Sequence, residues 1–169
     1  MLFNGLLILI LLVCMYTDIK SRKIYNKVVY PGVFAALVCH LFMDGWGGLL
    51  QSFLGLCVGF AILLIPYLLG GMGAGDVKLL ALVGAFNGTV FVLQTSVYMA
   101  FVGALMAVFI LLFRKGRLRA VLFFLFSRMN RVKVPLSLDK SNKMYPYGVA
   151  IACGAFVTLI LDGKLIVWL

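Results

Sequence analysis

Acidic residues are scarce in this chain, and so are charges of any kind. The 169 residues include five acidic side chains, all Asp; charged residues make up 12% of the sequence and hydrophobic residues 64%. An ordinary soluble domain has about a quarter of its residues charged, so this composition excludes that class. With a mean hydropathy of +1.15, the chain is expected to be an integral membrane protein.

Cysteine pairs with the spacing of metal ligands are also missing. The chain has four cysteines at wide, irregular intervals and no Cys-x-x-Cys pair. This excludes a zinc knuckle and a disulfide framework, and no metal or other cofactor is expected. No basic segment precedes the first apolar stretch, so we expect it to be retained as a span rather than removed as a signal peptide.

Long apolar segments fill most of the chain and predict an all-α membrane bundle. At about 20 residues per span there is room for about six transmembrane helices. We therefore expect residues 1–169 to form a single membrane-embedded domain. Tight turns built from residues that stop helices are expected at 44–48 and 87–89, with a bend or unwinding near Pro66. The predicted spans are Leu2–Thr17, Val28–Met43, Leu49–Leu69, Asp76–Phe86, Val90–Phe113 and Tyr147–Leu161.

The basic residues are distributed unevenly among the predicted loops. Alternate loops collect fourteen of the fifteen Lys and Arg, and Lys164 alone falls on the other side. Because cytoplasmic loops are enriched in Lys and Arg, this predicts a multi-pass inner-membrane protein with both termini outside. The net charge of +10 is then explained by contacts with lipid headgroups, and no nucleic-acid partner is expected.

One long cytoplasmic loop is predicted, over 114–146. Within it, residues 120–126 are apolar but too few to cross a bilayer, and arginines flank them. This pattern is typical of an interfacial or re-entrant helix, and a seventh span is the alternative.

Two carboxylates fall on the predicted cytoplasmic side. Asp18 ends the first span and precedes a basic run that includes Lys20 and Arg22, and Asp76 begins the fourth span. That span has about 11 residues and a length of roughly 16 Å, against a hydrocarbon core of about 30 Å. We therefore expect the segment 70–75 to enter the membrane and a wet cavity to surround Asp76.

Paired carboxyl groups are the machinery of an aspartyl protease. One is ionised and activates water, while the other is protonated and polarises the scissile carbonyl. Gly73 and Gly75 would let the backbone approach a substrate closely. Each feature also has a purely structural interpretation: Asp76 as a helix N-cap, and Asp18 as a charge at the membrane surface. Their occurrence together favours the catalytic interpretation.

Three segments carry a resemblance to a known family. Residues 73–81 (GAGDVKLLA), which include Lys78, look like the GxGD motif of type IV prepilin peptidases, which are intramembrane aspartyl proteases. Residues 18–26 are similar to the first motif of that family, and residues 145–150, with Pro146 and Gly148, to a segment before its last span.

The resemblance implies a catalytic pair, Asp18 and Asp76, at the cytoplasmic face. Gly73, Gly75, Lys78, Lys20, Arg22, Pro146 and Gly148 would be motif or substrate-positioning residues. The expected substrate is a prepilin-like protein of a type IV pilus, with a basic leader and an apolar helix, cut after a glycine. The chain resembles the short form without the Cys-motif domain, so N-methylation is not expected. The sequence does not specify the pilin or an oligomeric state.

Two other classes of function remain open on the sequence. A small proton- or cation-coupled transporter or channel subunit could use the same two Asp residues, because broken helices and intramembrane carboxylates are also transporter features. A scaffold for pilus assembly would leave the motifs unexplained.

Overall fold

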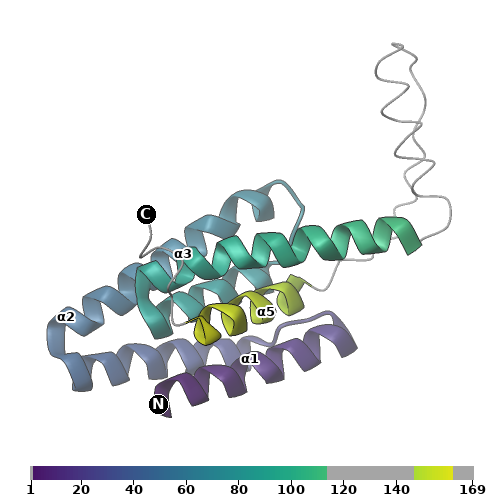
Figure 1. Ribbon diagram of the computed structural model, residues 1–169. Helices are drawn as coiled ribbons and strands as arrows, with labels where there is room; N and C mark the ends of the chain where they lie inside the picture. Colours follow the sequence, from purple (N-terminus) through teal and green to yellow (C-terminus); the bar gives the residue numbers. More distant parts are fainter. Residues whose placement is uncertain (1, 114–146, 162–169) are drawn as a thin grey trace. The chain divides into compact units, whose positions relative to one another are not determined.

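The described part of the chain, residues 2–113 and 147–161 of a computed structural model, is built from helices alone (Figure 1). This confirms the all-α prediction. The four helices are α1 (Leu2–Ser21), α2 (Asn26–Leu68), α3 (Ala74–Phe113) and α5 (Tyr147–Ile160). Segments of α1, α2 and α3 are long and apolar enough to cross a membrane, and α5 is a shorter apolar helix.

Six helices were expected, and the described residues form four, because α2 and α3 each continue through a predicted turn. Each contains one glycine with non-helical backbone: Gly45 with φ 64° and ψ −147°, and Gly88 with φ 81° and ψ −175°. These dihedrals cost little for glycine and are strained for other residues. Figure 1 shows both helices reversing direction partway along their length.

Two other helix boundaries differ from the sequence-based expectation. The first helix runs to Ser21, so Asp18 lies within its last turn rather than beyond its end. Pro66 does not unwind α2, which continues to Leu68.

The first part of α3, residues 74–87, is enclosed by other helices. Its apolar side chains from Leu79 to Phe86 are all buried. A helix that is apolar on every side is expected only where neighbours surround it. The helix therefore forms the centre of the unit made by residues 2–102 and 147–161.

Glycines allow the second part of α2 to approach this central helix closely. Gly55 lies against the backbone of Gly84, and a Cβ atom on Gly59 would lie 2.6 Å from the carbonyl oxygen of Leu80. Backbones can come this close only where side chains are absent. Residues 103–113 of α3 belong to a second unit, and the single domain over 1–169 stays a prediction.

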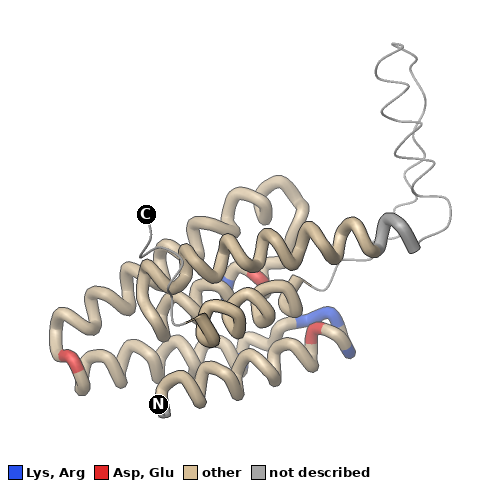
Figure 2. Tube along the Cα trace, in the orientation of Figure 1, with Lys and Arg blue, Asp and Glu red and all other residues tan. Residues whose placement is uncertain are grey.

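Charged residues of the described part occur mainly at helix ends and turns, with long uncharged stretches between them (Figure 2). Asp18, Lys20, Arg22 and Lys23 lie at or just beyond the end of α1, and Asp76 and Lys78 lie in the first turns of α3. The predicted interfacial helix at 120–126 and Lys164 lie outside the described residues.

Candidate active site

Asp76 occupies the first turn of α3 and is 7% exposed. Its Oδ2 atom accepts a hydrogen bond of 3.2 Å from the backbone N–H of Gly73, and its own N–H donates to the Gly73 carbonyl at 3.1 Å. This is one half of a capping box, in which an acidic side chain reaches back to the residue before the helix. Asp76 is therefore not the N-cap residue that the structural interpretation expected: Gly73 occupies that position, and the Asp76 side chain bonds back to it from the first turn, which also fixes the carboxylate.

Asp18 lies in the last turn of α1, is 5% exposed, and faces the first turn of α5. The backbone N–H groups of Gly148 and Val149 are close to its carboxylate. The N-terminal end of a helix carries partial positive charge, so α5 provides a favourable environment for this anion. Among the described residues, Asp18 Oδ2 is buried and has no hydrogen-bond partner.

The linker between α1 and α2 begins at a residue with unusual backbone. Arg22 has φ 52°, and its N–H donates to the Asp18 carbonyl at 2.9 Å. A left-handed residue directly after a helix ends it and lets the chain change direction. The linker therefore leaves α1 one turn after Asp18 and passes the start of α3, where Ile24 contacts Gly75.

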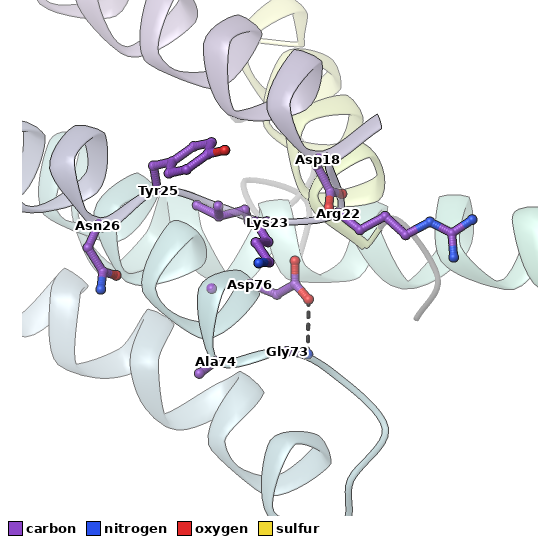
Figure 3. A pocket seen from close by; sticks show the side chains of 10 residues that line it. Asp18, Arg22, Lys23, Tyr25, Asn26, Gly73, Ala74 and Asp76 are labelled. Atoms are coloured by element: carbon purple, nitrogen blue, oxygen red, sulfur yellow. Dashed lines mark hydrogen bonds between the residues drawn. The ribbon is translucent and has the colours of Figure 1, made fainter. Parts of the chain in front are cut away.

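A cavity of about 370 Å³ lies between the linker and the start of α3. In Figure 3 the Asp18 and Asp76 carboxylates approach it from different helices, and the two are near enough to interact electrostatically. The cavity expected around Asp76 is therefore present, and the chain's two predicted catalytic carboxylates share it. It is lined by Asp18, Arg22, Lys23, Ile24, Tyr25, Asn26, Gly73, Ala74, Gly75 and Asp76.

The other predicted site residues take different positions. Gly73, Gly75 and Arg22 line the cavity, and Gly148 packs against Asp18. Lys78 is not a lining residue; its ammonium donates to Asn26 Oδ1 at 3.1 Å and lies 5.1 Å from the centre of the Tyr30 ring.

Of the two remaining predicted residues, the structure describes Lys20. Lys20 lies over the Tyr16 ring, with its ammonium 5.7 Å from the ring centre, and does not line the cavity. Pro146 lies outside the described residues.

Five lining residues were missed by the sequence analysis. Lys23, Ile24, Tyr25 and Asn26 belong to the segment that was recognised as a motif, and Ala74 lies between the two predicted glycines. Their proximity in sequence to Asp18 and Asp76 was the available signal. Within the described ranges, no group of three or more His, Cys, Asp or Glu side chains is placed to hold a metal ion.

A second cavity, of about 420 Å³, lies at the other end of the central helix. Its polar lining comes from carboxamide and hydroxyl side chains, without a charged residue. The lining residues are Asn4, Asn87, Val90, Phe91, Gln94, Thr158 and Leu159.

The helices and the shared cavity define a membrane-embedded protein with two carboxylates in one site. The model of the type IV leader peptidase family matches residues 5–112, and the chain belongs to this family. The matched range contains both Asp18 and Asp76, while Gly148 lies beyond it. The family membership predicted from the motifs is confirmed, and the family is one of proteases. No curated protein and no solved structure matches it.

Proposed function

We propose that the protein is an aspartic endopeptidase that removes the basic leader from prepilin-like proteins at the cytoplasmic face of the inner membrane. The observation that carries this proposal is the shared cavity, in which the buried carboxylates of Asp18 and Asp76 approach each other from different helices. Family membership supports the peptidase class.

The proposed chemistry needs one proton shared between the two carboxyl groups. The ionised Asp takes a proton from water as the water oxygen attacks the scissile carbonyl carbon, and the protonated Asp donates to the carbonyl oxygen. The carbon–nitrogen bond of the tetrahedral intermediate then breaks: the first Asp returns its proton to the leaving amine, and the second Asp takes back the proton of one hydroxyl group as the new carboxyl group forms. This sequence uses no metal or cofactor.

Charge distribution supports the cytoplasmic orientation. The α1–α2 linker and the residues beside it hold five basic side chains, Lys20, Arg22, Lys23, Lys27 and Lys78, on the side where the cavity lies. By the positive-inside rule this end faces the cytoplasm. Because an uninterrupted helix of 43 residues would span about 65 Å, we further propose that α2 and α3 each cross the bilayer twice, with reversals at Gly45 and Gly88.

The proposal is tested by incubating purified protein with a peptide that carries a basic leader ending in glycine, followed by an apolar helix. Asp18→Asn and Asp76→Asn should each abolish leader release while keeping the thermal unfolding transition of the wild type. Asp44→Asn is the matched control, because Asp44 is exposed and lies at the Gly45 turn. Retained cleavage in either active-site variant would contradict the proposal.

The transporter alternative predicts a different result in the same preparation. The peptide would stay intact, and vesicles containing the protein would show ion flux that depends on Asp18 and Asp76. No contact in the described residues favours this alternative.

A further inference from the structure

The central helix, residues 74–87 of α3, is held at its end opposite Asp76 by two side chains of α2. Ser52 Oγ donates a hydrogen bond of 2.6 Å to the carbonyl oxygen of Ala85. His40 Nε2 lies 2.8 Å from the carbonyl oxygen of Phe86. A carbonyl oxygen only accepts, so the hydrogen bond requires a proton on Nε2.

These two carbonyl groups lie next to the break in α3 at Gly88. Carbonyl groups at the end of a helical segment lose their intrahelical N–H partners, and an unpaired buried carbonyl is costly. His40 and Ser52 come from opposite sides of the α2 break at Gly45. The end of the central helix is therefore tied to both parts of α2.

The environment of the two donors fixes their orientation. Ser52 is 1% exposed, and the His40 ring packs edge-on against Phe3 of α1, with ring centroids 4.8 Å apart. Phe3 in turn contacts the Phe86 ring, with centroids 4.9 Å apart. Both donors are thus held in place by packing against neighbouring helices.

The second ring nitrogen of His40 makes a weaker contact than Nε2 does. Its Nδ1 atom lies 3.4 Å from Asp44 Oδ2, and the Asp44 side chain is 63% exposed. An exposed pair at this distance contributes little. The structural role of His40 therefore depends on the Nε2 proton and the Phe86 carbonyl, and Asp44 provides a control.

Hydrogen bonds at this end matter because the contacts of the middle of the helix are apolar. Leu79 to Phe86 are buried among apolar groups, and the glycines at positions 55 and 84 bring two backbones together without interlocking side chains. Apolar contact is non-directional, whereas a hydrogen bond has a preferred distance and angle. The bonds from Ser52 and His40 therefore add directional restraint to the close packing at this end of the helix.

We propose that His40 and Ser52 are positioning residues that set the axial and rotational position of the central helix. They thereby hold the Asp76 carboxylate opposite Asp18, although Asp76 is ten residues, or about 15 Å, from Phe86. The consequence for cleavage rests on the proposed function; the effect on the helix does not.

The test compares His40→Phe, which keeps a ring but removes the donor, with His40→Gln, which keeps an N–H donor. Ser52→Ala removes the other donor and remains informative if His40→Phe does not fold. In leader cleavage we expect kcat to fall about tenfold in His40→Phe and Ser52→Ala with KM unchanged, since a displaced catalytic group weakens the transition state and not the substrate complex. His40→Gln should recover most of the rate, and Asp44→Ala should match the wild type.

A second readout does not depend on cleavage. Hydrogen–deuterium exchange of the backbone amides at 77–87 should become faster in His40→Phe and Ser52→Ala and should return to the wild-type rate in His40→Gln. Unchanged exchange in both donor-deleted variants would overturn the inference, and so would a rise in KM with kcat unaffected. If the wild type cleaves no leader, the proposed function fails while the exchange rates still decide the positioning role.

Discussion

Gly148 lies directly against the carboxylate of Asp18. A Cβ atom on residue 148 would be 2.7 Å from Asp18 Oδ2 and 3.1 Å from Cγ. This contact joins the first turn of α5 to the last turn of α1, and it gives a physical reason for glycine in the third sequence motif. Any other side chain there would displace the carboxylate.

Replacement of Gly148 by Ala should therefore impair catalysis more than folding. The added methyl meets the end of a side chain that can rotate, so the cost in unfolding free energy is small, at about 1 kcal/mol or less. The rotation would displace the Asp18 carboxylate from its present position, and we expect at least a tenfold loss of kcat for leader cleavage. Gly5→Ala is the control, because nothing lies within 4 Å of a Cβ at that position. Wild-type activity in Gly148→Ala would contradict this role.

A paired substitution tests the contact between the linker and α3. A Cβ atom on Gly75 would lie 2.9 Å from the Cβ of Ile24, so Gly75→Ala should push the linker away and lower activity. The new methyl group would meet the Cβ atom of residue 24, which every residue except glycine carries. Only glycine at position 24 therefore removes this contact. We expect Gly75→Ala combined with Ile24→Gly to be more active than Gly75→Ala alone. Cleavage rates of the single and double variants measure the coupling.

Lys78 should affect substrate binding through Asn26, which lines the cavity. Lys78→Met removes the donor to Asn26 Oδ1 and the cation over Tyr30. Because the pair is exposed, we expect a modest rise in KM, about fivefold, with kcat preserved. Lys20→Met is the matched control, since Lys20 contacts the Tyr16 ring away from the cavity. An equal rise in KM in both variants would contradict a role of the Lys78–Asn26 hydrogen bond and would attribute the effect to the loss of a positive charge.

The close contact of Gly55 and Gly84 should control stability rather than chemistry. A methyl group on Gly55 would meet the backbone of Gly84, which cannot rotate away. Gly55→Ala should therefore destabilise the fold by about 1–3 kcal/mol or more, seen as a lower unfolding temperature in detergent. Gly47→Ala, on the same helix with open space around it, should unfold like the wild type.

The sequence was informative where a residue type is rare. Two carboxylates on the same predicted side of the membrane, in a chain with five acidic residues, indicated a common site, and Asp18 and Asp76 do share a cavity. Glycine-rich runs likewise marked the reversals at Gly45 and Gly88. The helix count was wrong because hydrogen bonding continues on both sides of one non-helical residue.

The remaining features depend on contacts between distant segments, which local patterns do not encode. Hydropathy could not indicate that His40 and Ser52 reach the carbonyls of Phe86 and Ala85. Gly148 was selected from a motif, yet its reason, proximity to Asp18, is visible only once α1 and α5 are packed together. Lys20 was selected for its charge, and its side chain turns to Tyr16 instead.

The buried apolar core from Leu79 to Phe86 separates the cavity at Asp18 and Asp76 from the polar cavity at Asn87. Water that enters one therefore finds no hydrophilic path to the other along this helix. A membrane enzyme that admits water for hydrolysis must avoid dissipating the electrochemical gradient of its host. We therefore expect the buried apolar stretch that follows Asp76 to keep protons from crossing the bilayer along the central helix.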